Sequence, residues 1–264
     1  MKLDTASYCL VAIRCALLAG EELVKGFNTS YAISSKEGKH NLVTAYDTLS
    51  EKLIIEIITQ EFPHHTILAE ESGLQDLGSD VIWVIDPLDG TVNFAHNIPL
   101  FSISIAVVVK GEIACAVIYQ PITKELFTAQ KDQGAFLNGK RLQVSSTADL
   151  EEAILSTGFP YNVDENPLQC IDQMARALHK GLPIRRLGSA AIDLAYTAAG
   201  RFDVYWEASL EPWDIAAGKL ILEEAGGQLT TYEGTSRPYH TRESVLATNG
   251  RLHEEMKRLL KASL

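Results

Sequence analysis

The nine residues DPLDGTVNF, from Asp86 to Phe94, decide how the rest of the chain can be interpreted. They directly follow the apolar run VIWVI at residues 81–85, which is typical of a buried strand. Asp86 therefore stands at the carboxyl end of a predicted strand, where α/β folds commonly assemble their sites. Gly90 and Thr91 follow, and a glycine turn that opens a short helix presents free backbone N–H groups suited to a phosphate or another anion.

Two further segments carry acids that could join this site. Glu70 and Glu71 follow the strand-like run TILA at residues 66–69, and Asp214 lies near the start of a predicted helix. Carboxylate oxygens without a supporting Cys or His cluster select Mg²⁺, Mn²⁺ or Ca²⁺ over zinc. An acidic metal site beside an anion-binding turn predicts metal-assisted phosphate hydrolysis. Structural roles stay open: Asp214 could only complement the helix dipole, and Glu70 and Glu71 could form a solvated pair.

The secondary structure predicted around these motifs differs between two parts of the chain. Apolar spacing predicts helices over 5–25 and over about 47–62, with Asp47 at the N-cap position of the second. From about residue 101 to 144 the pattern is β, and Asn138-Gly139 predicts a type I′ hairpin. Beyond residue 150, strands near 153–156, 183–187, 202–206, 228–231 and 244–247 alternate with helices at 167–180, 189–199, 212–225 and the C-terminus. We therefore expect an α+β half, residues 1–150, packed on an α/β half, residues 151–264.

Composition excludes several classes of protein. The chain of 264 residues has 23 Lys and Arg against 34 Asp and Glu, for a net charge of −11. This balance disfavours a nucleic acid or an anionic membrane as the main partner, because both attract clustered basic residues. The four cysteines show no C-x-x-C spacing, which favours reduced thiols in a cytoplasmic protein. Charges interrupt the apolar N-terminus, so we expect an amphipathic helix there and a soluble protein without a signal peptide or membrane span.

The motifs together resemble those of the inositol monophosphatase family. DPLDGTVNF matches the family signature D-P-x-D-G-T-x-N-F, and WDIAAG at 213–218 matches W-D-x-A-x-G. EES at 70–72 and LVTAYD at 42–47 match two shorter family segments, with Lys36 upstream. The resemblance spans residues 36–227 and implies the layered sugar-phosphatase fold, with alternating αβαβα layers.

The same resemblance implies a role for each matching position. One metal ion would be bound by Glu70, Asp86 and the Leu88 carbonyl, a second by Asp86, Asp89 and Asp214, and a third mostly through water by Asp47 with Glu70. The phosphate would lie on the amides of Gly90 and Thr91, while the Thr91 hydroxyl helps Glu70 orient the attacking water. The hydroxyls of the substrate would meet Gly188, Ser189, Ala190 and Glu207, beside Asp89 and Asp214, and Lys36 would act as a gating or ion-pairing residue.

The resemblance implies a lithium-sensitive phosphomonoesterase that uses two or three Mg²⁺ ions, with Mn²⁺ as a possible substitute. Its substrate would be inositol monophosphate or a related small sugar or polyol phosphate, and many family members are homodimers. Fructose 1,6-bisphosphate, histidinol phosphate and 3′-phosphoadenosine nucleotides remain alternative substrates, and Arg185 or Arg186 could meet a second phosphate. A catalytically silent metal-binding regulatory protein remains the alternative from another class. A phosphatase of the haloacid dehalogenase type is disfavoured, because Pro87 stands where its D-x-D-G-T motif needs an acid.

Overall fold

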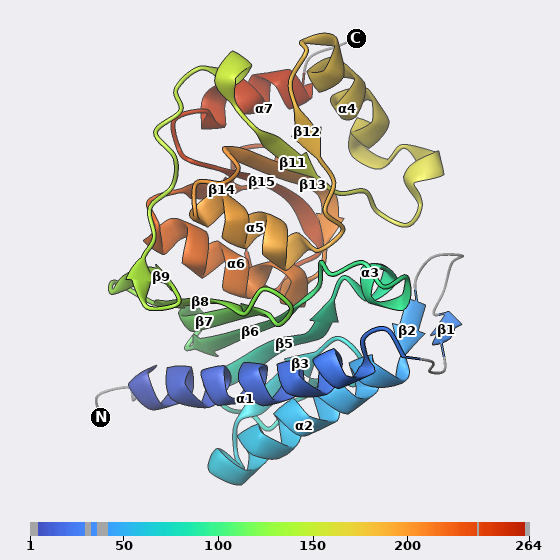
Figure 1. Ribbon diagram of the computed structural model, residues 1–264. Helices are drawn as coiled ribbons and strands as arrows, with labels where there is room; N and C mark the ends of the chain where they lie inside the picture. The colour runs from blue at the N-terminus through green and yellow to red at the C-terminus, as the bar shows by residue number, and fades with distance from the viewer. Residues whose placement is uncertain (1–4, 30–32, 36–41, 237, 262–264) are drawn as a thin grey trace.

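The computed structural model describes residues 5–29, 33–35, 42–236 and 238–261, and it stacks them in five layers (Figure 1). A helix pair, a first sheet, a second helix pair, a second sheet and a third helix pair follow one another along the molecule. The predicted αβαβα layering is therefore confirmed. Within the described residues no helix is long and apolar enough to cross a membrane.

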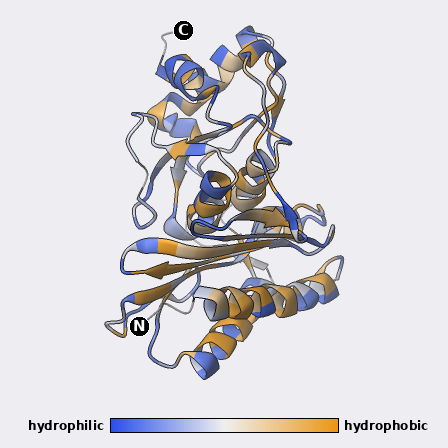
Figure 2. Ribbon diagram, turned by 90° about the vertical axis from the view of Figure 1, so that its left-hand side faces the viewer, coloured by the Kyte–Doolittle hydropathy of each residue, from blue (hydrophilic) through white to orange (hydrophobic). Residues whose placement is uncertain are grey.

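The first sheet has eight strands in the order β10-β9-β8-β7-β6-β5-β3-β4. The long central strands are hydrophobic over most of their length (Figure 2), because both faces of this sheet are covered by helices. Helices α1 (Thr5–Gly26) and α2 (Ala45–Glu61) cover one face. The strands are β3 (Thr66–Ala69), β4 (Gly73–Gln75), β5 (Val81–Asp89), β6 (Ser102–Val109), β7 (Glu112–Gln120), β8 (Glu125–Gln130), β9 (Gly134–Leu137) and β10 (Lys140–Arg141).

Two helices from later in the chain cover the other face of the first sheet. These are α5 (Ala190–Ala198) and α6 (Pro212–Glu224), and their opposite side packs on the second sheet. That sheet has the order β12-β11-β13-β15-β14, and α4 (Cys170–His179) and α7 (His253–Lys261) cover its outer face. Its strands are β11 (Leu155–Thr157), β12 (Ile184–Arg185), β13 (Val204–Leu210), β14 (Gln228–Thr230) and β15 (Glu243–Thr248). A small pair, β1 (Ile33–Ser35) and β2 (Leu42–Thr44), precedes α2.

Most predicted elements form, and two local interpretations were wrong. Asp47 is not the N-cap of α2: Thr44 is, and Asp47 is the third helical residue, whose carboxylate accepts from the Thr44 backbone in a capping box. The strand predicted at 81–85 continues to Asp89 through an irregularity in its pairing with β6 between Asp86 and Asp89. At the predicted hairpin, Asn138 and Gly139 both have positive φ, as a type I′ turn requires.

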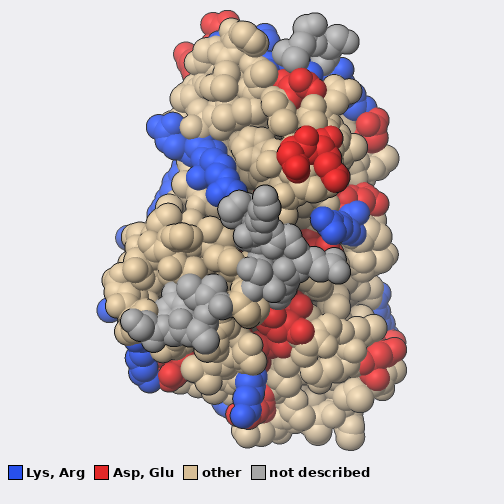
Figure 3. All heavy atoms as spheres, turned by 90° about the vertical axis from the view of Figure 1, so that its right-hand side faces the viewer, with Lys and Arg blue, Asp and Glu red and all other residues tan. Residues whose placement is uncertain are grey.

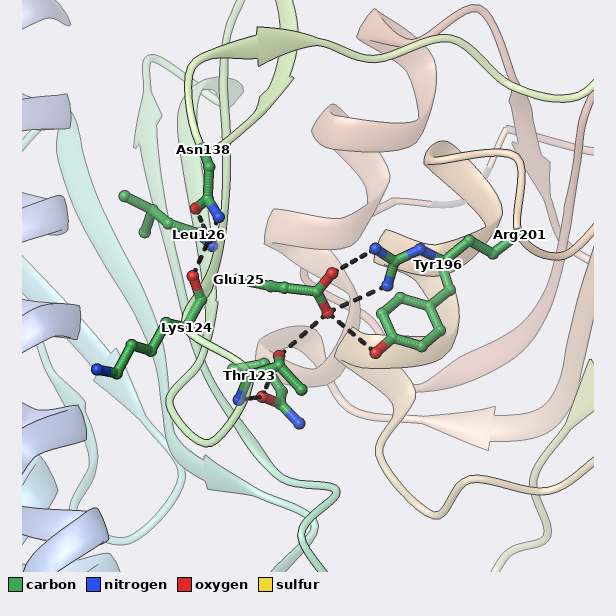
Figure 4. Close-up of polar contacts among 8 residues, drawn as sticks. Thr123, Lys124, Glu125, Leu126, Asn138, Tyr196 and Arg201 are labelled. Carbon is green, nitrogen blue, oxygen red and sulfur yellow. Dashed lines mark hydrogen bonds and ion pairs between the residues drawn. The ribbon is translucent and has the colours of Figure 1, made fainter.

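A polar cluster, drawn in Figure 4, ties strand β8 of the first sheet to α5 and to Arg201, which follows it. The carboxylate of Glu125, in β8, accepts from the Arg201 guanidinium and from the Tyr196 hydroxyl, the latter at 3.1 Å. The Arg201 guanidinium also stacks over the Tyr196 ring, 4.3 Å from its centroid. Because the hydrogen bonds to Glu125 join residues more than 70 positions apart, they hold the middle helix layer against the sheet below it.

Candidate active site

A cavity of about 680 Å³ opens between the two sheets, and its lining comes from both. Of the described site residues that the family motifs indicate, all except Asp47 line it, namely Glu70, Asp86, Leu88, Asp89, Gly90, Thr91, Gly188, Ser189, Ala190, Glu207 and Asp214. Lys36 lies outside the described residues. Of the two candidate arginines, Arg186 lines the cavity and Arg185 does not.

Strand pairing explains why the first acids meet. β3 and β5 run parallel and adjacent, with Ala69 opposite Ile85, so the residues that follow lie at the same sheet edge. The amide of Glu70 donates to the carbonyl of Ile85 at 3.1 Å, which places Glu70 beside Asp86. The hydroxyl of Ser50, in α2, donates to the carbonyl of Pro87 at 2.7 Å and fixes the bend between Asp86 and Asp89.

Asp86 is more deeply buried than Glu70, Asp89 or Asp214, and only 2% of its surface is exposed. Its Oδ1 atom accepts from the Leu88 amide at 3.0 Å. Burial raises the pKa of Asp86 well above its ordinary value, and the negative charges of Glu70, Asp89 and Asp214 raise it further. The pKa of Asp214 is raised in the same way, first by burial and then by the charges of Asp89 and Glu70. The site thus concentrates negative charge that a divalent cation would neutralise.

Asp89 joins this cluster to the other half of the molecule. Its carboxylate accepts from the Ser189 hydroxyl and from the amides of Ala190 and Ala191, at 3.3 and 2.7 Å. These groups form the N-terminal end of α5, so the helix dipole and its free amides favour the ionised acid. Burial outweighs these hydrogen bonds and raises the pKa of Asp89 to about 6.

Asp47 lies behind the cavity wall and acts on it through Thr91. Asp47 is 1% exposed, and its Oδ2 atom accepts from the amide and the hydroxyl of Thr44 at 2.7 and 2.6 Å. The Thr91 hydroxyl donates to Asp47 Oδ1 at 2.7 Å and also lies 3.0 Å from the Leu88 carbonyl. Asp47 therefore fixes the orientation of the hydroxyl of Thr91, a residue that lines the cavity.

The turn after β5 has a backbone that only glycine adopts easily. Gly90 has φ of 97°, and a Cβ atom at this position would lie 3.0 Å from the Leu100 carbonyl. Gly90 is the N-cap of the short helix α3 (Thr91–Ala95), whose first amides have no partner within the helix. The Asn93 side-chain amide donates to the carbonyls of Leu100 and Leu187, at 2.7 and 2.8 Å, which holds this turn against the Leu187–Gly188 segment.

The far wall of the cavity carries Glu207, in β13. Its Oε2 atom accepts from the Tyr205 hydroxyl at 2.6 Å and packs so closely on Gly158 that a Cβ atom there would lie 2.0 Å away. Burial raises the pKa of Glu207 to about 7, although the Tyr205 hydrogen bond and the Arg186 charge oppose this. The sequence motifs did not indicate Gly158, Tyr205 or the cavity-lining Arg242, since these residues reach the site only through the pairing of the second sheet.

Whether these residues suit a divalent metal ion can be tested on their chemistry. In the described part of the chain, no three His, Cys, Asp or Glu side chains stand close enough to hold an ion as they lie. The atoms that line the cavity and could bind a metal ion are all oxygens, and oxygens are the ligands that Mg²⁺ prefers. The donor set therefore fits Mg²⁺.

Charge outside the cavity is mixed in sign. Figure 3 looks at the side of the molecule on which α3 lies in Figure 1. Over the described part of this face, groups of acidic side chains and groups of basic side chains lie next to one another. At the cavity rim, the Arg242 guanidinium pairs with the Glu211 carboxylate at 3.3 Å.

Comparisons with known proteins agree with the fold and the motifs. A sequence profile of the inositol monophosphatase family matches residues 4–264. The chain is 44% identical to the Nus factor SuhB of Escherichia coli (strain K12), over 93% of this chain and 92% of the relative. It is 40% identical to an inositol-1-monophosphatase of Synechocystis, over 98% of this chain and 91% of the relative. The crystal structure of the extragenic suppressor protein suhB from Bartonella henselae superposes with a TM-score of 0.92 at 36% identity, covering 98% and 100% of the two chains.

Proposed function

This chain belongs to the inositol monophosphatase family, and from that premise we propose that it is a Mg²⁺-dependent phosphomonoesterase. Its substrate is inositol monophosphate or a related small sugar or polyol phosphate. One observation carries the proposal: Glu70, Asp86, Asp89 and Asp214 line one cavity beside the glycine turn at Gly90. The similarity to the inositol-1-monophosphatase of Synechocystis supports the choice of substrate.

Different residues of the chain would bind the metal ions, bind the phosphate and orient the attacking water. Glu70, Asp86, Asp89, Asp214 and the Leu88 carbonyl would hold two or three Mg²⁺ ions, with Mn²⁺ as a substitute. When bound, such ions ease the ionisation of water and neutralise charge on the phosphoryl group. The amides at the start of α3 bind phosphate oxygens, and the Thr91 hydroxyl, held by Asp47, orients the attacking water for in-line transfer.

The alcohol leaves toward the second half of the molecule. Asp214, at the start of α6, and Glu207, in β13, line that side of the cavity. Because these carboxylates can accept hydrogen bonds from hydroxyls, they would orient a polyol so that its ester oxygen faces the metal-binding acids. Ser189 and Ala190 have a further role there, since their hydroxyl and amide hold Asp89 in place.

A panel of phosphate esters tests this proposal. Purified protein is assayed with inositol 1-phosphate, fructose 1,6-bisphosphate, histidinol phosphate and 3′-phosphoadenosine 5′-phosphate, with Mg²⁺ or a chelator, and with or without Li⁺. We expect Mg²⁺-dependent release of phosphate from inositol 1-phosphate, which Li⁺ inhibits. Preference for one of the other three esters would reassign the substrate, and release without a divalent ion would contradict the mechanism.

A second candidate is a protein of this fold that acts by binding. It is favoured by the name Nus factor, which several relatives at 42–44% identity carry. The same panel separates the two candidates, because a protein that binds Mg²⁺ and hydrolyses none of the esters would support the second. We further propose a cytoplasmic homodimer, which cell fractionation and sedimentation would check.

A further inference from the structure

Glu51 is a buried acid of α2 that lies outside the matched family motifs and does not line the cavity. It is 4% exposed, and its Oε2 atom accepts a hydrogen bond from the backbone amide of Glu71 at 2.8 Å. Burying a carboxylate is unfavourable unless hydrogen bonds or charges compensate for it. The amide that Glu51 holds belongs to the residue next to Glu70, which does line the cavity.

Glu51 belongs to the side of α2 that faces the site. Asp47, Ser50 and Glu51 are spaced three and four residues apart, so they lie on the same side of the helix, and all three are buried. Asp47 holds the hydroxyl at the start of α3, Ser50 holds the bend within β5, and Glu51 holds the turn between β3 and β4. One side of one helix therefore supports three separate segments of the site.

The turn that carries Glu70 lies at the edge of the first sheet. It connects β3 to β4, which has three residues and, in the described part of the chain, pairs with β3 alone. The Glu70 amide donates to the carbonyl of Ile85, in β5, at 3.1 Å, and the Glu71 amide donates to Glu51. Two successive amides thus attach the turn to two different elements, β5 and α2. The second attachment depends on a side chain and can therefore be removed by substitution.

We propose that Glu51 is a positioning residue for Glu70. By holding the Glu71 amide, it keeps the turn in place and the Glu70 carboxylate beside Asp86 in the cavity lining. The inference rests on the proposed phosphatase function and deepens it, since Glu70 is one of the acids that would hold Mg²⁺. A carboxylate suits this role, because a hydrogen bond to an ionised acceptor is roughly twice as strong as one between neutral groups.

Three substitutions of Glu51 test the inference. Calorimetric titration of Mg²⁺ into the purified protein without substrate measures the affinity for the ion. We expect Glu51→Ala, which removes the acceptor, to weaken Mg²⁺ binding about tenfold or more, as replacing residues that hold metal ligands commonly does. Glu51→Gln keeps a neutral acceptor at the same place and should lose about threefold or less. Glu51→Asp keeps the charge but withdraws the acceptor by one methylene group, so it should lose more than Glu51→Gln, and it replaces Glu51→Ala if that variant does not fold.

Activity assays give a second measurement. With inositol 1-phosphate as substrate, Glu51→Ala should raise the Mg²⁺ concentration for half-maximal activity by about the same factor as it weakens binding. An unchanged Mg²⁺ affinity in both Glu51→Ala and Glu51→Asp would overturn the proposal. A loss in Glu51→Gln as large as that in Glu51→Ala would overturn it too, because the charge rather than the position of the turn would then matter.

Thr66→Val serves as the matched control, because it acts on the same two strands away from the site. Thr66 is 2% exposed and does not line the cavity, and its hydroxyl accepts from the amides of Leu77 and Ser79 at 3.1 and 3.4 Å. The variant should lower the melting temperature and leave the Mg²⁺ affinity unchanged. If it weakens Mg²⁺ binding as much as Glu51→Ala does, the effect is a general loosening of β3 and β4, and the proposal is wrong.

The proposed function and this inference fail in different ways. If the wild type binds Mg²⁺ but hydrolyses none of the four esters, the proposed function is wrong, and the titrations still decide the inference. If the wild type hydrolyses inositol 1-phosphate with Mg²⁺ and the Glu51 variants bind the ion as tightly as it does, only the inference is wrong. A wild type that binds no Mg²⁺ would overturn both.

Discussion

Thr91 and Asp47, 44 positions apart in the sequence, are joined by a hydrogen bond of 2.7 Å between a hydroxyl that lines the cavity and a carboxylate behind its wall. Asp47 is itself fixed by two hydrogen bonds from Thr44. Because the Thr91 hydroxyl and the Asp47 carboxylate have few other hydrogen-bond partners to choose from, the hydroxyl is held in its orientation before any substrate arrives.

Replacing the hydroxyl of Thr91 tests this pre-organisation. We expect Thr91→Val to lower kcat about 10²- to 10³-fold, because a positioned proton acceptor typically contributes this much. Thr91→Ser keeps the hydroxyl and should retain activity within about tenfold of the wild type. Stopped assays with inositol 1-phosphate and circular dichroism check activity and fold. Equal activity in the valine and serine variants would contradict the role of the hydroxyl.

Asp89→Asn tests the metal-binding assignment. We expect turnover to fall by more than about 10³-fold, since the variant removes a negative oxygen ligand. The free energy of unfolding should stay within about 2 kcal/mol, because weaker hydrogen bonds to α5 are offset by less repulsion with Asp86 and Asp214. Asp164→Asn, at an exposed carboxylate, is the control of equal charge. Near-wild-type turnover in Asp89→Asn would remove Asp89 from the ligand set.

The stability of the metal-free protein should decrease as pH rises. The folded-state pKa is raised to about 6 for Asp89 and to about 7 for Glu207, above the ordinary values of 3.8 and 4.5. A carboxyl group whose pKa is raised in the folded state contributes its full stabilisation at pH values below its ordinary pKa. This stabilisation is lost as the pH rises through the folded-state pKa. Between pH 4.5 and 7.5 these two shifts together predict a loss on the order of 5 kcal/mol in chelator.

Divalent ions should reverse this trend. Mg²⁺ stabilises the ionised acids, so the melting temperature at pH 7.5 should rise on its addition, and less at pH 5. Differential scanning calorimetry with Mg²⁺ or a chelator measures both. A metal-free melting temperature that does not change over this pH range would refute the prediction.

Gly158→Ala tests how Glu207 is held. The new Cβ atom would lie 2.0 Å from Glu207 Oε2, so the carboxylate would have to move. We expect KM for inositol 1-phosphate to rise about tenfold or more, and the free energy of unfolding to fall by about 1–3 kcal/mol. Tyr205→Phe removes the hydrogen bond to Glu207 without this clash and should raise KM by less. A KM that stays unchanged in both variants would show that Glu207 does not touch the substrate.

Local patterns predicted the parts of the site that lie close together in sequence. The order of strand, glycine turn and short helix over residues 81–95 could be inferred because each element depends on its own residues. The N-cap of α2 was misplaced by three residues, since an acid at the third helical position and an acid at the cap look alike in sequence.

Contacts between distant segments could not be inferred in this way. The partners of Asp89 in α5 lie about 100 positions away, and the hydrogen bond from Thr91 to Asp47 depends on α2 packing under β5. Asp193 carried only a weak signal, a single acid in the apolar helix AAIDLAYTA. Whether Asp193 lines the cavity depends on which way that helix faces, and only the packing of the two sheets decides this.

The position of α5 and α6 has a consequence for how the chain is made. These helices cover one face of the first sheet, yet they follow its last strand by about fifty residues or more. At a synthesis rate of roughly 5–20 residues per second, several seconds separate the emergence of that sheet from that of its cover. The nascent first half therefore leaves the ribosome with an apolar surface still open to other chains. For this molecule, chaperone dependence should be greatest during that interval, and a pause in translation just after residue 150 would lengthen it.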